Sequence, residues 1–461
     1  MTSLAELSAH QLLEGFADGR FDPVQVHDAV QAEISRREPE LNTFWMRDPA
    51  ESSAAAGASA ERWRHGHPCG PLDGVPVTVK ENIARAGVPM PSGNAAVIPV
   101  IPEHDDPITT RLREAGAVIL GSTVMPDWGM LSSGVSSLHG ITRSPWNPAW
   151  TTGGSSSGAG AAAAAGFGPL HVGSDIGGSI RLPGTWLGLA TLKPTGGLIP
   201  LGAPYLGRAA GPLTRTAEDA RLLLDVLAGP AQGDWTSLPP LGAQPRASDP
   251  SRLRIGFQPE AGDGMAVDPE VAAAVTAAVD LFADSGAEIV ELPGSCSDQV
   301  LTDLDRFWRV RSLRDQQILP GDRQELTLPF IQRWVQQAAG TSGEQLMDCY
   351  HAIGTLQRRT VDLTAGCDLV LSPVAPVAAF PAEWPMPFGE QDLGMAHIGF
   401  TVPYNMSGQP AGTVNCGFTG DGRPIGLQIA GQRFTDDLVL DAMAWFETHR
   451  PASTTPVWPI G

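Results

Sequence analysis

Apolar residues recur at helical spacing through the first third of the chain, and helix-start signals precede them. The run Ser8-Ala-His-Gln11 has the spacing of a capping box. Asp22-Pro23 comes directly before apolar residues at positions 24, 26, 30 and 34, which predicts a second, amphipathic helix. We therefore expect residues 1–65 to form an outer helical layer.

A period of two replaces the helical spacing at residues 75–80. Three valines alternate there with Thr78 and Lys80, which predicts a strand with the lysine on the face opposite the valines. If helices cover both faces of the sheet, Lys80 is buried.

The middle of the chain alternates between helix and strand signals. Small residues at 158–166 favour a helix that packs closely on a sheet, and Gly166 and Gly168 predict its end. Residues 170–173 predict a short buried strand that leads into a glycine-rich turn. A cap at Thr216 predicts a helix with its leucines inside that ends at Gly229-Pro230.

The C-terminal half continues this mixture after an irregular connection over residues 229–250. A strand at 253–257, a helix starting at Asp268-Pro269 and a strand at 287–292 predict a parallel pair. We expect residues 300–365 to be mostly helical and further strands at 368–373 and 426–431. The pattern predicts an α/β protein with helices on both faces of a mostly parallel or mixed sheet.

The composition supports one large domain. The 461 residues contain 42% hydrophobic and 17% charged residues, and no stretch has the bias of a long linker. Within this domain we expect a helical layer (1–65), a core with the candidate chemistry (66–230), a C-terminal part (251–447) and a tail (448–461).

The charge balance argues against nucleic-acid binding. Fifty acidic and thirty basic side chains give a formal charge of -20, and no basic block could follow a phosphate backbone. The N-terminus does not resemble a signal peptide, and the small-residue run 159–170 is too short to span a bilayer. We expect a cytoplasmic protein, either a monomer or a homodimer.

The cysteine pattern indicates reduced thiols. The five cysteines are scattered, without a C-x-x-C pair or a zinc pattern, and we expect no metal site. Cys416 lies in an apolar segment, and we favour a buried structural thiol over a nucleophile there. The others are Cys69, Cys296, Cys349 and Cys367.

Three short motifs carry the candidate chemistry: Gly74-Val-Pro-Val-Thr-Val-Lys-Glu-Asn82, Gly153-Gly-Ser-Ser-Ser-Gly158 and Gly173-Ser-Asp-Ile-Gly-Gly-Ser-Ile-Arg181. Each alone is a weak signal, because a glycine-serine stretch is usually a flexible linker. Together they resemble the amidase signature family of serine hydrolases, most densely over residues 70–230. One departure is Trp186-Leu-Gly-Leu-Ala-Thr-Leu-Lys-Pro-Thr195, where family members often have Cys-Gly-x-x-Gly-Leu-Lys-Pro-Thr; it implies different local packing.

The resemblance implies a role for each motif and the amidase signature fold. Lys80 corresponds to the base, Ser155 to the bridging serine after a cis peptide bond, and Ser179 to the nucleophile. Burial can lower the pKa of a lysine from about 10.4 toward roughly 7 to 8, where part of it is a free amine. No cofactor is implied.

The turn before the nucleophile is the expected oxyanion hole, because successive backbone N–H groups can face the developing negative charge. By resemblance the donors are the N–H groups of Ile176, Gly177, Gly178 and Ser179. We expect Asp175 and Arg181 to support this turn rather than react.

Residues near the motifs are candidates for the substrate pocket. By position we expect Trp128, Gly129 and Met130 to line it, and from beyond the nucleophile Tyr205, Leu206 and Arg208. The aromatic and thioether groups favour an apolar acyl or leaving group. The nearest resemblance is to urethanases and aryl acylamidases, so we expect a small neutral amide, anilide or aryl carbamate.

Two local motifs suggest other enzymes. Gly154-Ser-Ser-Ser-Gly158 also fits a nucleophile elbow with Ser156 as nucleophile, and Asp368 and His397 follow in triad order. Residues 158–163 fit a dinucleotide fingerprint. Both motifs need a hydrophobic strand directly before them, and the sequence offers none there.

A third alternative keeps the family but changes the role. The chain could act through a complex, like the amidotransferase subunit that releases ammonia from glutamine. That role needs a pocket for a charged amino-acid head group, and the sequence shows no acidic-basic pair dedicated to it.

Overall fold

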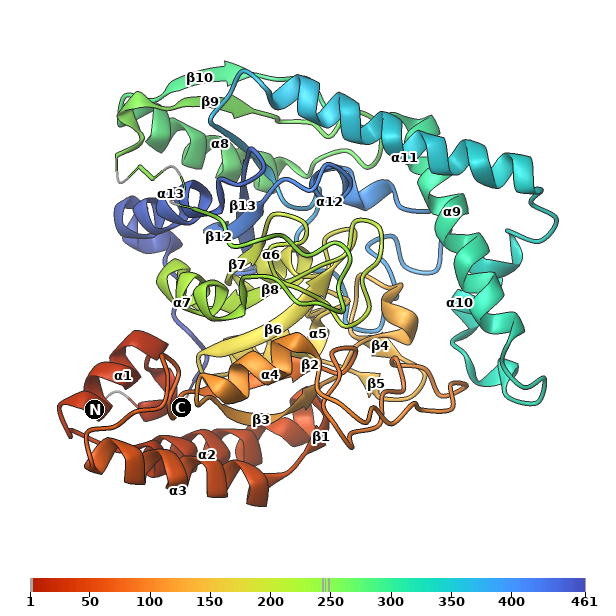
Figure 1. The fold of residues 1–461 in the computed structure, drawn as a ribbon. Helices are drawn as coiled ribbons and strands as arrows, with labels where there is room; N and C mark the ends of the chain where they lie inside the picture. The colour runs from red at the N-terminus through yellow and green to blue at the C-terminus, as the bar shows by residue number, and fades with distance from the viewer. Residues whose placement is uncertain (1–2, 243, 245, 248, 461) are drawn as a thin grey trace.

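The computed structural model describes residues 3–242, 244, 246–247 and 249–460, and a large sheet runs through its centre (Figure 1). The sheet has 11 strands in the order β1-β3-β2-β6-β8-β7-β12-β13-β11-β9-β10. Its strands are β1 (Phe44–Arg47), β2 (Pro76–Lys80), β3 (Val118–Thr123), β6 (Leu170–Asp175), β7 (Ala190–Lys193), β8 (Ala209–Thr214), β9 (Arg254–Phe257), β10 (Glu288–Glu291), β11 (Leu369–Pro373), β12 (Ala411–Phe418) and β13 (Pro424–Gly431).

The sheet is mixed: two parallel groups of three strands enclose an antiparallel centre, and β1 adds an antiparallel edge strand. β3, β2 and β6 are parallel, as are β11, β9 and β10, which confirms the parallel pair predicted around residues 253–292. From β6 to β11 every neighbouring pair is antiparallel. A separate small sheet joins β4 (Val135–Ser136) and β5 (Gly140–Ile141).

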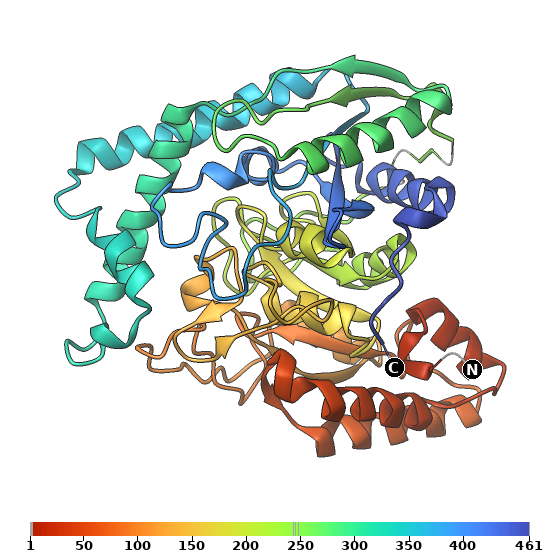
Figure 2. The same ribbon diagram turned by 180° about the vertical axis from the view of Figure 1, so that it is seen from behind.

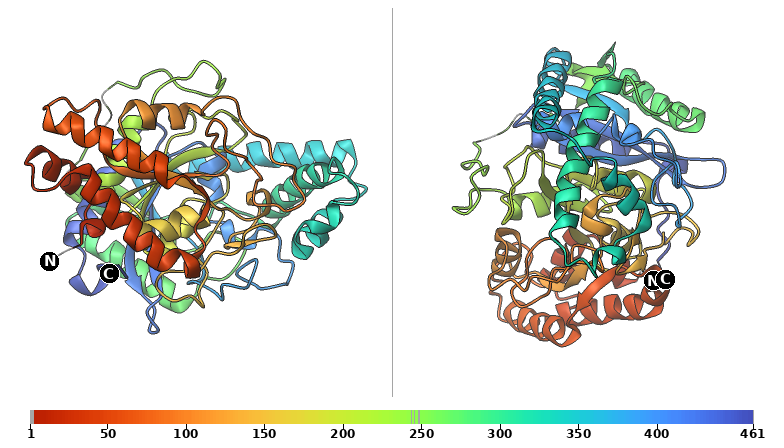
Figure 3. Two further views of the ribbon diagram at one scale, coloured as in Figure 1. Left: turned by 90° about the horizontal axis from the view of Figure 1, so that it is seen from below. Right: turned by 90° about the vertical axis from the view of Figure 1, so that its right-hand side faces the viewer.

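The N-terminal helices begin where the caps predict. Ser8 caps α1 (Ala9–Ala17) in a capping box, and Asp22 caps α2 (Pro23–Leu41) with proline in its first turn. α2 and α3 (Pro49–Arg64) lie side by side beneath the sheet (Figure 3). The layer is not purely helical, because β1 leaves it to pair with β3 at the sheet edge.

Helices cover both faces of the sheet, as predicted. Consecutive residues of β12 show this: a Cβ on Gly412 would meet Met443 of α13 (Asp436–His449), and Thr413 approaches Gly184 of α6 (Arg181–Leu187). Since successive residues of a strand face opposite sides, α6 and α13 lie on opposite faces. α5 (Ser157–Ala164) packs against α6, α7 (Ala217–Leu227) packs against α13, and α4 (Pro107–Glu114) packs against α7.

The C-terminal half adds a helical arm beside the sheet. α9 (Asp298–Gln317) and α10 (Pro329–Gln336) lie to one side of the strands, and α11 (Gly343–Thr364) packs along α9 (Figures 1 and 2). α8 (Pro269–Asp284) starts at Asp268-Pro269 as predicted, and α12 (Val402–Met406) is short. The predicted connection over residues 229–250 has no helix or strand up to residue 242, and residues 243, 245 and 248 within it lie outside the described part.

Candidate active site

Lys80 ends strand β2 inside the protein. Its side chain has 0% exposure, and its Nζ lies 2.8 Å from Ser155 Oγ, 3.1 Å from Ser156 Oγ and 3.2 Å from Ser174 Oγ. The period-two pattern therefore predicted its burial correctly. Ser174, from β6, is a partner that the sequence did not reveal.

The loop before α5 places Ser155 next to Lys80. The peptide bond between Gly154 and Ser155 is cis, as the family resemblance implied. A Cβ at Gly154 would lie 2.4 Å from the Ser133 carbonyl oxygen, so only glycine fits there. Ser156 then forms the N-cap position of α5.

The environment of Lys80 favours its neutral form. Burial lowers its pKa to about 7, the nearby Arg208 lowers it too, and Asp175 and Glu81 oppose the shift. A group with this pKa is about half unprotonated at neutral pH. A neutral amine donates two hydrogen bonds and accepts one, so Lys80 can take a proton from the Ser155 hydroxyl.

Ser179 lies in the turn between β6 and α6, next to these groups. The Ser156 N–H donates to the Ser179 carbonyl over 3.1 Å, which ties the two segments together. Ser179 is half-buried, and Ser155 and Ser179 line the same cavity. The Ser179 hydroxyl makes no hydrogen bond to another described residue. The hydrogen bond expected between Ser179 and Ser155 is therefore not formed in this structure.

Asp175 organises the turn around Ser179. Its carboxylate accepts hydrogen bonds from the N–H groups of Gly178 (2.8 Å) and Ile180 (3.0 Å) and from Arg181 Nη2 (2.9 Å). The Arg181 charge and these hydrogen bonds hold the pKa of this buried carboxyl below its usual range despite burial. Asp175 and Arg181 thus lie where they support the turn.

The same contacts correct the expected oxyanion hole. The Gly178 N–H donates to Asp175 and is not available to a substrate. The N–H groups of Ile176, Gly177 and Ser179 have no such partner within the described residues and stay candidates. Gly178 is still required, because its φ is 125° and a Cβ would lie 2.7 Å from Thr401 Oγ1.

Two cavities meet at Ser179. We call the smaller one, of about 60 Å³, the narrow cavity, and the larger one, of about 420 Å³, the wide cavity. Most of the predicted pocket residues line one or both of them, namely Trp128, Gly129, Met130, Tyr205 and Arg208. The prediction of Leu206 is wrong, because this residue is 38% exposed and lines neither cavity. The narrow cavity is lined by Trp128, Gly129, Met130, Leu131, Ser132, Ile176, Gly177, Ser179, Leu182, Trp308, Arg311, Met395 and Ile398.

The contribution of α9 to both cavities was not predicted from the sequence. Trp308 lines the narrow cavity, Asp315 lines the wide one, and Arg311 lines both. Arg311 stacks over the Tyr205 ring at 5.2 Å, and its Nη2 lies 2.9 Å from the Met130 sulfur. No local motif marks these residues, because only the tertiary fold brings α9 to the signature motifs.

Comparisons with known proteins agree with this geometry. A family model described as Amidase matches residues 25–440. The chain belongs to the amidase signature family. An acylamidase from Rhodococcus erythropolis is 32% identical over 460 residues, covering 96% of each chain. A subunit of the glutamyl-tRNA(Gln) amidotransferase from Salinispora arenicola is 33% identical, covering 99% of this chain and 100% of the relative.

Solved structures place the fold in the same family. The structure of a bacterial aryl acylamidase of the amidase signature family has a TM-score of 0.86 and 26% identity, with 96% of each chain covered. A 6-aminohexanoate cyclic dimer hydrolase has a TM-score of 0.82 and 26% identity, with 98% of each chain covered. This amidase signature protein is accordingly a hydrolase that acts on carbon-nitrogen amide bonds.

Trp186, at the departure from the usual family motif, packs under the loop that contains the cis bond. Trp186 is buried, and its Nε1 donates to the Val377 carbonyl over 2.8 Å. Its ring lies edge-on to Phe380 at 5.1 Å, and a Cβ on Gly153 would come within 2.7 Å of it. The indole therefore packs directly against Gly153, one residue before Gly154 of the cis bond.

The amidase signature fold rules out the nucleophile-elbow alternative. His397 pairs with Ser132, Asp368 accepts from the backbone N–H of Arg254, and Ser156 bonds to Lys80. These three residues do not form a triad. The dinucleotide fingerprint fails as well, because residues 158–163 lie inside α5, with no strand directly before it.

The cysteine prediction agrees with the structure. Cys416 is buried, and burial raises the pKa of its thiol to about 12, so it is not a thiolate at neutral pH. All five thiols are free, with Cys69 exposed.

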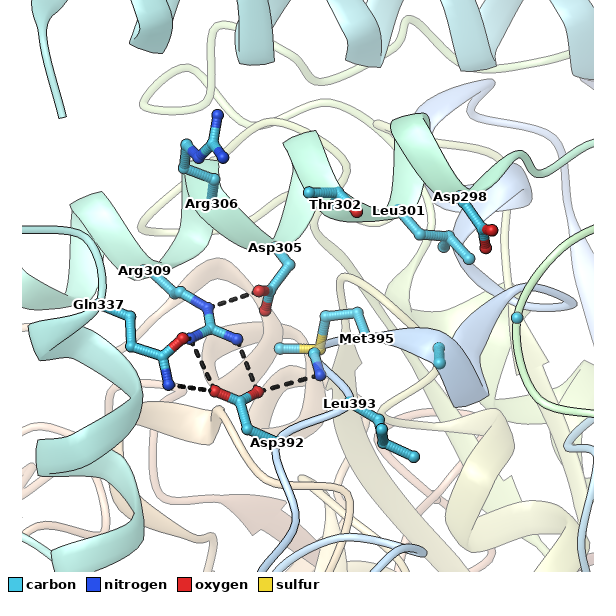
Figure 4. Close-up of a pocket in the computed structure, with 13 residues that line it drawn as sticks. Asp298, Leu301, Thr302, Asp305, Arg306, Arg309, Gln337, Asp392, Leu393 and Met395 are labelled. Carbon is cyan, nitrogen blue, oxygen red and sulfur yellow. Dashed lines mark hydrogen bonds and ion pairs between the residues drawn. The ribbon is translucent and has the colours of Figure 1, made fainter.

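A separate cavity of about 710 Å³ lies along another part of α9 and contains no serine or lysine (Figure 4). Arg309 lines this cavity and donates two hydrogen bonds of 2.9 and 2.7 Å to the Asp392 carboxylate, which Gln337 also contacts. Met395 lines both this cavity and the narrow one. Arg309 thus fixes the segment that forms one wall of the narrow cavity.

The helices offer no means of crossing a bilayer: none in the described part of the chain combines sufficient length with sufficient apolar character.

Proposed function

We propose that this amidase signature protein hydrolyses small neutral anilides and aryl carbamates through Lys80, Ser155 and Ser179. The observation that carries the proposal is the buried Lys80 amine, 2.8 Å from the Oγ of Ser155, which lines the same cavity as Ser179. The names of two relatives, an acylamidase and an aryl acylamidase, support the same substrate class.

The chemical steps follow from these groups. Ser179 Oγ attacks the substrate carbonyl while its proton passes to Ser155, and the Ser155 proton passes to the Lys80 amine. The oxyanion lies against the N–H groups of Ile176, Gly177 and Ser179. Lys80 returns the proton through Ser155 to the leaving amine or alcohol, and water then releases the acyl or carbamoyl group.

The shapes of the cavities favour a small acyl group and an aromatic leaving group. The narrow cavity is mostly apolar and has a volume of about 60 Å³, whereas the wide cavity of about 420 Å³ contains Tyr205 and Trp128. An aromatic ring in the wide cavity can stack on these side chains. For a carbamate the carbamoyl group would then be transferred to Ser179, and its hydrolysis product loses CO₂.

A substrate panel and two serine variants test the proposal. The panel contains anilides, aryl carbamates, free amino-acid amides and glutamine. Ser179→Ala should lower turnover of every substrate by about 10⁴-fold or more. If Ser156→Ala abolishes activity and Ser179→Ala does not, the assignment of the nucleophile is wrong.

One observation supports a second candidate, glutamine hydrolysis within an amidotransferase complex. The structure supplies an acidic-basic pair that the sequence did not reveal, since Arg311 and Asp315 both line the wide cavity one helical turn apart. Such a pair can bind the carboxylate and ammonium of an amino acid. Glutaminase activity that exceeds anilide hydrolysis would favour this candidate. A cytoplasmic location and a monomeric or homodimeric state stay predictions.

A further inference from the structure

A polar pair forms part of the mainly apolar wall of the narrow cavity, which Ser179 and Arg311 also line. Ser132 lines this cavity with 7% exposure, and its Oγ lies 2.7 Å from His397 Nε2. His397 itself has 0% exposure, and the Phe388 ring packs edge-on against it at 5.7 Å. The serine hydroxyl therefore lies between a buried imidazole and the space next to Ser179.

The protonation of His397 follows from its surroundings. Burial lowers its pKa to about 3, so the imidazole is neutral at physiological pH and carries a single N–H. Nδ1 is buried and has no hydrogen-bond partner in the described part of the chain. Nδ1 is unpaired in either tautomer, but with the proton on Nε2 the imidazole N–H is paired with Ser132 Oγ, and the hydroxyl proton can turn toward the cavity, where water or a ligand can accept it. The 2.7 Å distance fits either direction of the bond, and we take the proton to lie on Nε2, where it is donated to Ser132.

This tautomer determines what Ser132 offers to the cavity. Its oxygen accepts from His397, so the hydroxyl proton has to find another acceptor. Ser132 Oγ makes no other hydrogen bond to a described residue. Its surroundings in the cavity include Met130, Leu182 and Ile398, whose side chains do not accept strong hydrogen bonds. A bound acyl group can supply that acceptor.

We propose that Ser132, held by His397, is a hydrogen-bond donor that selects acyl groups with an oxygen acceptor over all-carbon groups of the same length. This inference rests on the proposed function, because it concerns the acyl group that Ser179 would take up. An unmet donor in a mainly apolar site discriminates between ligands that do and do not satisfy it. Ser132 is the specificity-determining residue, and His397 is its positioning residue.

Matched 4-nitroanilides test the proposal. Butanoyl and methoxyacetyl anilides differ by one CH₂-to-oxygen exchange, as do pentanoyl and 3-methoxypropanoyl anilides. Because the ether oxygen also makes the carbonyl more electrophilic, each kcat/KM is divided by the rate constant for alkaline hydrolysis of the same anilide. We expect the wild type to prefer one ether over its alkyl partner by about tenfold in kcat/KM. Hydrolysis of the alkyl anilides reports on the proposed function, whereas the ether-to-alkyl ratio reports on Ser132.

Two pairs of variants separate hydrogen bonding from packing. Ser132→Cys keeps the size of the side chain but weakens the donor, and should bring the ratio close to one, whereas Ser132→Thr keeps the hydroxyl and should retain the preference. His397→Gln keeps an N–H donor and His397→Leu removes it, so only the second should reduce the ratio. A merely structural role of either residue would change both substrates alike.

Two results would overturn the proposal: equal rates for both members of each pair in the wild type, or an ether preference that persists in Ser132→Cys. If no anilide is hydrolysed, the same acyl pairs are compared as boronic acids, with the Kd of each measured by calorimetry. A Kd ratio near one in the wild type then contradicts the proposal, and an ether preference that Ser132→Cys removes supports it.

Discussion

Two buried lysines have nearly the same electrostatics but very different surroundings. Lys80 and Lys193 both end a strand, have at most 1% exposure, and have a pKa lowered to about 7, mainly by burial. Lys80 Nζ reaches three hydroxyls, and two of them, those of Ser155 and Ser174, line the wide cavity. Among the described residues, Lys193 Nζ donates only to the Pro194 carbonyl.

The two lysines show that a lowered pKa does not identify a base by itself. A neutral amine can accept a proton only from a group within hydrogen-bond reach, so geometry comes first and pKa second. Lys193 has the same lowered pKa, but its amine is hydrogen-bonded to a carbonyl rather than to a hydroxyl that it could deprotonate. We therefore expect only Lys80 to be needed for activity, and both lysines to change the free energy of unfolding in the same direction.

The largest expected effect comes from replacing each lysine by the similarly long, neutral methionine. Lys80→Met should lower kcat/KM by about 10² to 10⁴-fold, because it removes the proton acceptor. Lys193→Met should cause no comparable loss. The measurement is steady-state anilide hydrolysis by variants whose folding is checked by circular dichroism, and an equal loss in both would refute the distinction.

The pH profile should depend on Lys80 alone. Since its pKa is about 7 and the free amine is the active form, kcat/KM should fall about tenfold per pH unit below that value and level off above it. Lys193→Met should show the same acid limb. If the acid limb of the kcat/KM profile shifts or disappears in Lys193→Met, then Lys193 rather than Lys80 controls the activity.

Both lysines should affect stability in the same direction. Each is protonated in the unfolded chain up to a pH of about 10.4 but only below about 7 in the folded protein. Between these values the unfolded state binds more protons, so the free energy of unfolding rises with pH, by up to about 1.4 kcal/mol per unit for each lysine.

This stability difference can be measured with urea titrations between pH 7 and 10. Lys193→Met should reduce the slope of the unfolding free energy against pH, and Lys80→Met should reduce it by a similar amount. An unchanged slope in both variants would show that neither amine is neutral in the folded protein.

The smallest effect should come from making the surroundings of Lys80 more like those of Lys193. Ser174→Ala removes one of the three hydroxyls around the amine and the acceptor of Asn82 Nδ2. Loss of one such bond costs about 1 kcal/mol, which corresponds to about fivefold in kcat. Ser174→Thr keeps the hydroxyl and serves as the control; if it loses as much activity, packing rather than hydrogen bonding is responsible.

The sequence predicted those parts of the site that depend on local motifs. The alternation that ends at Lys80 and the glycine turn before Ser179 are both contiguous patterns, and both lie where they were expected. β8 was missed because Gly211 and Pro212 within it argue against a strand, although Pro212 pairs with Val172 in the centre of the sheet.

Other parts depend on contacts that no local pattern contains. Trp308 and Arg311 of α9 lie far along the chain from Trp128, yet all three border the narrow cavity. The commitment of the Gly178 N–H to Asp175 could not be predicted either, because it depends on the conformation of the turn. Motifs thus supplied the candidate reactive groups, and tertiary packing supplied most of the walls of the candidate substrate cavities.

The outermost strand β10 has a consequence for how molecules of this protein meet one another. Its sequence is Glu-Ile-Val-Glu, and Glu288 and Glu291 at its two ends are exposed. A sheet edge with free backbone groups invites pairing with a second chain, and charges on a short edge strand oppose it. Replacing both glutamates by valine would therefore create an aggregation-prone edge, so these two side chains protect the fold from sheet-to-sheet polymerisation.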